Sequence, residues 1–240
     1  MKGIILAGGK GTRLYPCTIV VNKHLLPIYD RPMIYFPIET LVKAGCTELL
    51  IVSGSALGDI AQLIGNGERF GLKSVLYAYQ ENPDGISGAL RLAQSFIGKN
   101  EKFLVMLGDN VIFDDVSPYV EEFKKEPTNG CKLFIKEINN PTAFGVAEIS
   151  DGLITNIIEK PAIPKTNNAV IGLYMYDDHV FDIIKDLKPS ARGELEITDV
   201  NMVYVEALKA SYAILKSTWL DTGSFETLFE AGRLVSQMIG

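Results

Sequence analysis

The chain opens with a buried strand that runs directly into a glycine-rich loop. Residues 2–7, KGIILA, are mostly apolar, and they are followed by Gly8, Gly9 and Gly11 and then by Arg13. In open α/β sheets, ligands bind beyond the carboxyl ends of the strands. Glycines at that point expose backbone N–H groups and let a phosphate come close. The opening segment therefore predicts an α/β fold with an anion site at this loop.

Strand-like and helix-like segments alternate through the first half of the chain. Strands are expected at residues 48–54, 74–80 and 102–110, and helices at 32–45, 59–65 and 86–97. Pro32 would open the first of these helices and Gly45 would end it, whereas Pro37 interrupts its pattern. Alternation of this kind indicates βαβ units around a largely parallel sheet.

The second half of the chain is richer in strands. We expect them at residues 131–138, 144–150, 153–161 and 169–177, with few helices between them. The sequence Ser-Asp-Gly at 150–152 predicts a hairpin turn. The last segment, 224–240, predicts a helix whose apolar face holds Phe225, Leu228, Phe229, Gly232 and Val235. We therefore predict one α/β domain over residues 1–240, with a mixed, mostly parallel central sheet flanked by helices and a β-rich second half.

Composition argues against several classes of function. The 240 residues carry a net charge of −6 with no basic stripe, so nucleic acid is not an expected partner. No apolar run has membrane-spanning length, and the N-terminal run is too short for a signal peptide. The cysteines, Cys17, Cys46 and Cys131, are odd in number and unclustered, which is typical of reduced thiols. We expect a cytoplasmic protein that does not contact a membrane.

The glycine loop matches neither of two well-known phosphate loops. The dinucleotide fingerprint G-x-G-x-x-G fits at Gly9 and Gly11 but has Leu14 in place of its third glycine. The P-loop spacing fits Gly3 and Gly8 but has Gly9 where a lysine is required. A dinucleotide-binding dehydrogenase is therefore disfavoured. Taken alone, the loop is also compatible with a tight strand-to-helix turn.

A series of ordered motifs carries a wider resemblance. LAGGKGTRLYP is followed by NKHLLPIYDRPMIYFPIETL, QENPDG, LGDN, FGVAEI, IIEKP, AVIGLYMYD, RGELEITDVN and WLDTGSFETL. In this order, over nearly the whole chain, they resemble the sugar-nucleotide pyrophosphorylases, most closely the thymidylyltransferases that act on glucose 1-phosphate. The resemblance implies a Rossmann-like nucleotidyltransferase fold. It also implies transfer of a nucleotidyl group from dTTP to glucose 1-phosphate, which gives dTDP-glucose and pyrophosphate.

The implied chemistry needs positive charge more than it needs a base. The nucleophile would be a phosphate oxygen that is already anionic at neutral pH, because the second pKa of a phosphate group is about 6. In agreement with this, the chain has only two histidines, His24 and His179. Charge builds up on the α-phosphate and on the leaving pyrophosphate, so the site should hold cations and Mg²⁺. Mg²⁺ prefers one or two carboxylates together with phosphate oxygens and water.

The resemblance also implies a role for each candidate site residue. The implied catalytic residues are Arg13, Lys23, Lys160 and Asp109, and the implied Mg²⁺ ligands are Asp109 and Asp221. The implied nucleotide contacts are Leu6, Ala7, Gly8, Gly9, Gly11, Thr12, Arg13, Gln80, Pro83 and Gly85. The implied sugar contacts are Asn110, Gly145, Glu159, Lys160 and Val170. The nucleotide-binding half would then span residues of about 1–115, and the sugar-phosphate-binding half those of about 116–240.

Each of these assignments has a plainer alternative. Arg13 and Lys160 could be solvated side chains, and Asp109 could be a turn residue at the end of a strand. Asp221 could form an Asx turn. His24 is expected to pack or to form hydrogen bonds rather than to catalyse. Together the plainer alternatives are disfavoured, because the cations and carboxylates fall at the positions where the family has them.

Two alternatives to the implied function stay open. Thymine and uracil present the same hydrogen-bonding edge to Gln80, and the methyl group that distinguishes them is worth only about 1–3 kcal/mol. A UTP-using uridylyltransferase is therefore the first alternative. The second is a non-catalytic, regulatory module that binds nucleotide sugars, against which the intact set of charged residues argues. The sequence also leaves open which sugar 1-phosphate is used and whether the chain forms a homo-oligomer.

The chain departs from the family pattern at a few positions. Thymidylyltransferases commonly read P-D-G-L-A-Q-A, whereas this chain has Ser87 and Gly88 in place of Ala and Gln. Asn22 replaces the usual Ser before Lys23. Longer members also carry a further regulatory, subunit-contacting segment, so feedback regulation of that type is not expected here. We expect the change at 87–88 to affect the contacts around the base and the sugar.

Overall fold

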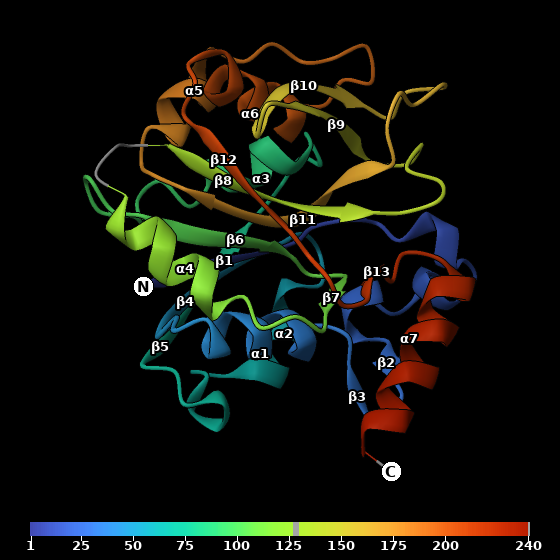
Figure 1. Ribbon diagram of the computed structural model, residues 1–240. Helices are drawn as coiled ribbons and strands as arrows, with labels where there is room; N and C mark the ends of the chain where they lie inside the picture. The colour runs from blue at the N-terminus through green and yellow to red at the C-terminus, as the bar shows by residue number, and fades with distance from the viewer. Residues whose placement is uncertain (127–129, 240) are drawn as a thin grey trace.

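The computed structural model describes residues 1–126 and 130–239. Within them, a nine-stranded sheet has the order β10-β9-β11-β6-β1-β4-β5, with β8 beside β11 and β12 beside β8 (Figure 1). The strands are β1 (Lys2–Ala7), β4 (Glu48–Ser53), β5 (Ser74–Tyr79), β6 (Phe103–Leu107), β8 (Cys131–Glu137), β9 (Gly145–Ser150), β10 (Leu153–Glu159), β11 (Asn168–Tyr176) and β12 (Ala210–Ile214). Two short ribbons pair β2 (Pro27–Ile28) with β3 (Arg31–Pro32) and β7 (Asn110–Ile112) with β13 (Trp219–Asp221).

In the described residues, three of the four parallel strand pairs come from the first half of the chain, and the fourth joins β8 and β12. β4 and β6 flank β1, and β5 lies beside β4, all in parallel. The chain thus leaves β1 toward one edge of the sheet and later returns to its other side with β6. Such a reversal of strand order opens a crevice at the carboxyl ends of the strands, where ligands bind in open α/β sheets. Here that point lies between the ends of β1 and β6.

The antiparallel part comes from the second half. β11 runs antiparallel to β6, β8 and β9, and β9 and β10 form a hairpin. The predicted Ser-Asp-Gly turn is confirmed. Asp151 and Gly152 have φ of 53° and 76°, as a tight two-residue hairpin requires. The predicted α/β fold with a mixed sheet is therefore confirmed.

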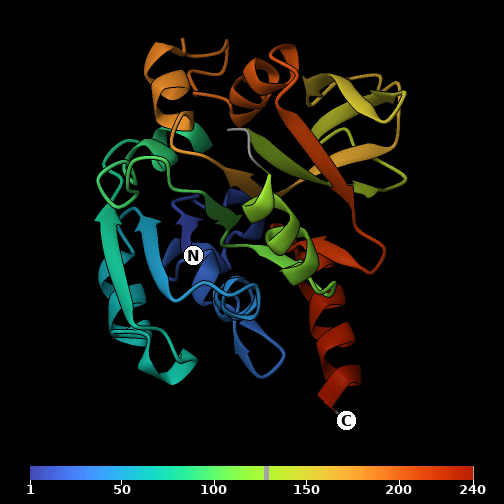
Figure 2. The ribbon, with the colours of Figure 1, turned by 60° about the vertical axis from the view of Figure 1, so that its left-hand side comes forward.

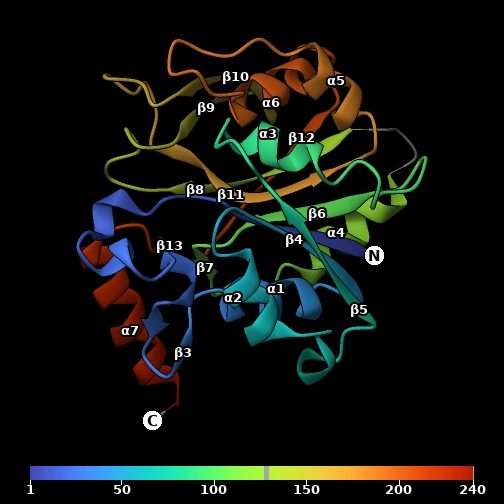
Figure 3. The same cartoon turned by 180° about the vertical axis from the view of Figure 1, so that it is seen from behind.

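Helices cover both faces of the sheet. α1 (Tyr35–Lys43), α2 (Leu57–Ile64) and α4 (Ser117–Lys125) pack on one face, and α3 (Ile86–Arg91), α5 (Val180–Asp186) and α6 (Ile197–Glu206) on the other. Figure 3 shows the two helical layers from behind. Alternate residues of β1 supply the two cores, Ile5 and Ala7 to the first and Ile4 and Leu6 to the second. Few helices were expected between the strands of residues 131–177, and the structure has none there; α4, α5 and α6, which lie outside that range, were not predicted.

Some element boundaries differ from the prediction. α1 begins at Tyr35 rather than Pro32, which belongs to β3. Pro37 does not disturb α1, because it is the third helical residue and the first four N–H groups of a helix have no partner within it. α3 ends at Arg91, six residues before the predicted end at Ile97.

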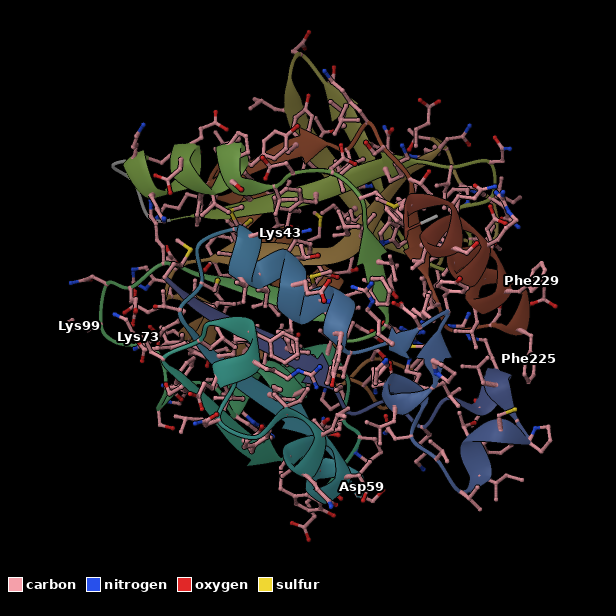
Figure 4. All side chains as sticks on the ribbon, turned by 90° about the horizontal axis from the view of Figure 1, so that it is seen from below. Lys43, Asp59, Lys73, Lys99, Phe225 and Phe229 are labelled. Carbon is pink, nitrogen blue, oxygen red and sulfur yellow. The ribbon has the colours of Figure 1, made fainter. Side chains whose placement is uncertain are left out.

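The last helix, α7 (Phe225–Ile239), buries a narrower face than predicted. It lies beside the two short ribbons, away from the main layers (Figure 2). Ala231 and Val235 are buried there, whereas Phe225 and Phe229 are 44% and 76% exposed and project outward (Figure 4). The predicted apolar face is therefore wrong at these two phenylalanines. In the described part of the chain, none of the helices combines the length and apolarity that crossing a membrane requires.

Candidate active site

Two adjoining cavities lie beyond the carboxyl ends of β1 and β6. The first, of about 500 Å³, is lined by the glycine loop and by residues 80–89, and we call it the nucleotide cavity. The second, of about 420 Å³, lies between β9, β10, β11 and α6, and we call it the sugar cavity. Ile86 and Leu107 line both. A larger cavity of about 620 Å³ beside α1 and α7 is lined by none of the predicted site residues.

Most of the predicted nucleotide contacts line the nucleotide cavity. Those that do are Leu6, Gly8, Gly9, Gly11, Thr12, Gln80, Pro83 and Gly85, together with Lys23 and Asp109. Ala7 is fully buried in β1 and is not part of the lining. Arg13 lines the sugar cavity instead. The predicted residues therefore gather in one place, with these two differences.

Glycine is required at two positions of the loop for different structural reasons. Gly11 has φ of 65°, a left-handed conformation that starts the short 3₁₀ helix Thr12–Leu14, and glycine adopts it without strain. A Cβ on Gly8 would lie 2.4 Å from Oε1 of Gln80, so any larger residue would push that side chain away. The loop keeps its backbone open to the cavity at Gly8 and turns the chain at Gly11.

A buried charge cluster lies under this loop. The Lys23 ammonium forms a short ion pair with Asp109, and both side chains are 11% exposed. Burial alone would raise the pKa of Asp109, but the Lys23 charge outweighs it and holds that pKa well below its usual range. Nζ of Lys23 would be 3.4 Å from a Cβ on Gly9, so the cation lies directly beside the loop.

His24 is a packing and hydrogen-bonding residue in this structure. Oδ1 of Asn22 accepts from the backbone N–H of His24 at 2.9 Å and lies 2.7 Å from its Nδ1. Oδ1 of an amide is an acceptor, so Nδ1 carries the proton. Burial, and next the Lys23 charge, lower the pKa of His24 to about 3, which keeps the ring neutral. The departure at Asn22 thus has a structural role.

Asp221 lies on β13, which pairs with the strand that follows Asp109. Its Oδ1 accepts from the Gly223 N–H at 2.9 Å, so the Asx-turn alternative is correct for that oxygen. Its Oδ2 lies 3.8 Å from Nη2 of Arg13, whose side chain is 60% exposed. Burial, and next the negative charge of Asp109, raise the pKa of Asp221 to about 6.

The two carboxylates have the chemistry of a magnesium site. Burial and then the charge of Asp109 raise the pKa of Asp221, and a divalent cation between the two carboxylates would relieve their repulsion. Within residues 1–126 and 130–239, no group of three or more His, Cys, Asp or Glu side chains is arranged to hold a metal. An ion here would take two carboxylates and fill its other positions with phosphate oxygens and water, as Mg²⁺ prefers.

Strand register brings three predicted sugar contacts together. Gly145 on β9 lies opposite Glu159 on β10 and opposite Val170 on β11. β11 pairs with β9 up to Val170 and with β6 only from Leu173 onward, so the two neighbours diverge between these residues. The sugar cavity occupies this divergence, where the backbone of β11 is not covered by a neighbouring strand.

The Glu159 carboxylate is held by two residues that the sequence analysis did not assign. Thr198 donates to its Oε2 at 2.5 Å, and Arg192 donates to its Oε1 at 3.3 Å while also pairing with Glu196 at 2.7 Å. Both lie in the RGELEITDVN segment, which contributed to the resemblance but received no roles. The other unassigned residues of the sugar cavity include Tyr174, Asn201 and Trp219.

Lys160 and Asn110 complete the sugar cavity in different ways. Lys160 has φ of 44°, which costs a residue other than glycine about 1–3 kcal/mol and is a strain that clusters at functional sites. Its Nζ lies 3.6 Å from Oε1 of Glu159. Asn110 mainly braces the fold: its Oδ1 accepts from Gly172 N–H and from Trp219 Nε1, at 3.1 and 2.7 Å. Its Nδ2 donates to Asp109, so a sugar contact of Asn110 stays a prediction.

Comparison with known proteins adds a family to this geometry. The sequence profile of the nucleotidyl transferases matches residues 2–238. Glucose-1-phosphate thymidylyltransferase from Neisseria meningitidis is 44% identical over 98% of this chain and 82% of its own length. The enzyme of the same name from Mycolicibacterium smegmatis is 42% identical, with the same coverage.

Solved structures have the same fold. One is described as a glucose-1-phosphate thymidylyltransferase from Bacillus anthracis in complex with sucrose, and it superimposes with a TM-score of 0.92 at 46% identity, covering 98% of this chain and 94% of that one. A UDP-glucose pyrophosphorylase in complex with UDP-glucose superimposes with a TM-score of 0.84 at 27% identity, covering 99% of this chain and 98% of that one.

Proposed function

The chain belongs to the nucleotidyl transferase family and is a nucleotidyltransferase, and from that premise we propose its substrates. We propose that it transfers the nucleotidyl group of dTTP to glucose 1-phosphate and releases pyrophosphate. The relatives at 42–44% identity carry the name of this activity. The observation that carries the proposal is that the two cavities lie against each other and share the lining residues Ile86 and Leu107. Two substrates bound in them would meet beside Asp109 and Asp221.

The sugar phosphate would act as its own nucleophile. Its anionic oxygen needs no general base, in agreement with the buried and neutral His24. Lys160 would hold this phosphate from the sugar side, while Glu159 accepts hydrogen bonds from the sugar hydroxyls. In-line attack on the α-phosphate forms the new P–O bond as the bond to pyrophosphate breaks.

The protein would contribute charge and position to this step. Lys23 lies beside the glycine loop and Arg13 beside Asp221, so their cations would border the triphosphate from both sides. Preorganised charges aimed at the oxygens of the transition state cost no reorganisation during the reaction. Asp109 and Asp221 would hold Mg²⁺, which would neutralise charge on the phosphate oxygens. Full activity after exhaustive chelation would contradict this metal requirement.

A pyrophosphate-release assay tests the substrate assignment. Each of dTTP, UTP, dCTP, ATP and GTP is crossed with glucose 1-phosphate, galactose 1-phosphate and mannose 1-phosphate in the presence of Mg²⁺. We expect the highest kcat/KM for dTTP with glucose 1-phosphate and a lower value for UTP. A higher value for UTP would favour a uridylyltransferase, which the structural likeness to UDP-glucose pyrophosphorylase makes the second candidate. Release that does not depend on a sugar 1-phosphate would contradict the proposal.

A further inference from the structure

Two acceptors fix the orientation of the Gln80 side-chain amide. Its Nε2 donates to Oδ1 of Asp84 at 3.0 Å and, more weakly, to the carbonyl oxygen of Gly85 at 3.5 Å. A carboxylate oxygen and a carbonyl oxygen can only accept, so the amide nitrogen must face them and the amide oxygen must face away. Gln80 is only 8% exposed, and this orientation is therefore held inside the protein.

The freed amide oxygen faces the nucleotide cavity. Oε1 of Gln80 lies next to the glycine loop, 2.4 Å from the place that a Cβ on Gly8 would occupy. In the described ranges, no residue donates a hydrogen bond to this oxygen. It is also not among the buried side-chain atoms without a partner, so it is accessible from the cavity. It is therefore an open acceptor on the wall of the cavity.

Asp84 is itself held in place from two sides. Its Oδ2 lies 3.1 Å from Nη2 of Arg91, and its backbone oxygen accepts from the N–H of Leu195 at 2.8 Å. Its carboxylate fills the space over Gly88, where a Cβ would lie 2.0 Å from Oδ1 and 2.3 Å from Cγ. Any side chain at position 88 would displace this carboxylate. The unusual glycine at 88 and the position of Asp84 thus belong together.

We propose that Asp84 is a positioning residue that sets base selectivity by turning the Gln80 oxygen toward the nucleotide, and that Gly88 leaves the room it needs. The inference rests on the proposed nucleotidyl transfer, and it specifies which bases the nucleotide substrate can carry. An open acceptor matches the N3–H of thymine or uracil. Cytosine carries a lone pair at N3, which the same oxygen repels. If the amide were released, it could turn over and offer its N–H₂ group to cytosine.

The test compares dTTP with dCTP as substrates of Asp84→Ala at saturating glucose 1-phosphate. We expect kcat/KM for dTTP to fall by about tenfold, the worth of one hydrogen bond to the base, through KM rather than kcat. The value for dCTP should stay constant or rise, so the preference for dTTP falls by about tenfold or more. The KM for glucose 1-phosphate should not change. An unchanged preference for dTTP in the folded variant would overturn the proposal.

Gly88→Ala provides a second test that removes no charge. Its Cβ should displace the Asp84 carboxylate, although alanine is the better helix former. We expect the preference for dTTP over dCTP to relax as it does in Asp84→Ala, while the melting temperature falls by no more than a few degrees. If this variant prefers dTTP over dCTP as strongly as the wild type does, Gln80 keeps its orientation without Asp84, which contradicts the proposal.

A double-variant cycle separates positioning from a general structural effect. In a Gln80→Ala background, Asp84→Ala should change the preference no further, because the group on which Asp84 acts is gone. A change of the same size as in the wild-type background would overturn the proposal. Asp59→Ala, an exposed carboxylate on α2 (Figure 4), is the matched control and should leave all constants unchanged.

Calorimetric binding of dTTP and dCTP in the same variants distinguishes this inference from the proposed function. A chain that released no pyrophosphate but bound dTTP more tightly than dCTP only while Asp84 is present would contradict the function and support the positioning role. Equal binding of the two nucleotides by the wild-type chain would contradict the positioning role alone.

Discussion

The nucleotide cavity and the sugar cavity adjoin each other but are built in different ways. The nucleotide cavity is formed by loops that follow parallel strands, so its residues come in short continuous stretches such as Gly8 to Thr12. The sugar cavity is formed where β9 and β6 diverge along β11. Its polar residues come from separate strands and from α6, and strand register brings them together.

In the proposed function, this difference gives the two cavities different tasks. A loop at the end of a parallel strand offers backbone N–H groups and charged side chains to a polyanion. A gap in an antiparallel sheet offers backbone groups and fixed side chains at a defined spacing, which suits a ring of hydroxyl groups. The first arrangement should govern turnover through charge, and the second should govern recognition of the sugar.

Arg13 tests this division most severely, because it follows the glycine loop in the chain but lines the sugar cavity. We expect Arg13→Ala to lower kcat by about 10²–10³, the usual cost of removing one preorganised charge donor. The KM for glucose 1-phosphate should change little, since in the proposed function Lys160 holds the phosphate of that substrate. The melting temperature should stay constant, because the Arg13 side chain is 60% exposed.

Arg13→Lys serves as the conservative variant and should recover only part of the loss, because a point charge cannot reproduce the bidentate guanidinium. Steady-state kinetics of both variants provide the measurement. Near-normal turnover of Arg13→Ala would show that Arg13 is a solvated loop residue.

Thr198→Val sharpens the account of the sugar side. It removes the 2.5 Å hydrogen bond to Glu159 and nearly preserves side-chain shape. A hydrogen bond to a charged group is worth about 1.5–3 kcal/mol, so the KM for glucose 1-phosphate should rise by about tenfold to a hundredfold while the KM for dTTP stays constant. Thr155→Val, at an exposed position on β10, the strand that carries Glu159, is the matched control. An equal rise of both KM values would contradict the division.

His24→Gln should have the smallest kinetic effect. If no histidine transfers a proton, turnover should stay within about tenfold of wild type, or about 1.4 kcal/mol of barrier. A loss near a thousandfold would reveal a missed proton-transfer role.

His24 should instead affect stability at acid pH. Its folded pKa is lowered to about 3 from 6.5, so below pH 6.5 the unfolded chain binds a proton that the folded chain excludes. The free energy of unfolding of the wild type should therefore fall as the pH drops from 6.5 toward 3. In His24→Gln this contribution is absent, and denaturant titrations across that range should show a weaker pH dependence. An equal pH dependence in both proteins would contradict the buried, neutral ring.

The sequence identified residues that line both cavities, but it missed the residues that hold Glu159 in place, for a physical reason. Short continuous motifs carry local geometry, so the glycine loop, the strand after it and the Ser-Asp-Gly hairpin could be read directly. Thr198 and Arg192 touch Glu159 only because the fold returns α6 and the loop before it to β10. Periodicity does not record such long-range neighbours.

The same reasoning explains the errors in the helices. The exposed Phe225 and Phe229 follow the periodicity of a buried face, but α7 packs mainly beside the short ribbons and buries a narrower stripe. The position of the Asp84 carboxylate over Gly88 also could not be predicted from the sequence. The sequence showed that Gly88 departs from the family pattern, but it did not show that the Asp84 carboxylate fills the space beside this glycine.

The most direct test of the two-sided site is a crossed comparison of two variants. Gly8→Val crowds the Gln80 side of the nucleotide cavity, and Glu159→Gln removes the charged acceptor of the sugar cavity. KM for each substrate is measured with the other at saturation, and melting temperatures establish that both variants fold. We predict that Gly8→Val raises only the KM for dTTP and that Glu159→Gln raises only the KM for glucose 1-phosphate, each by about tenfold or more. If either variant raises both KM values equally, the two cavities do not bind the two substrates separately, and the central claim is wrong.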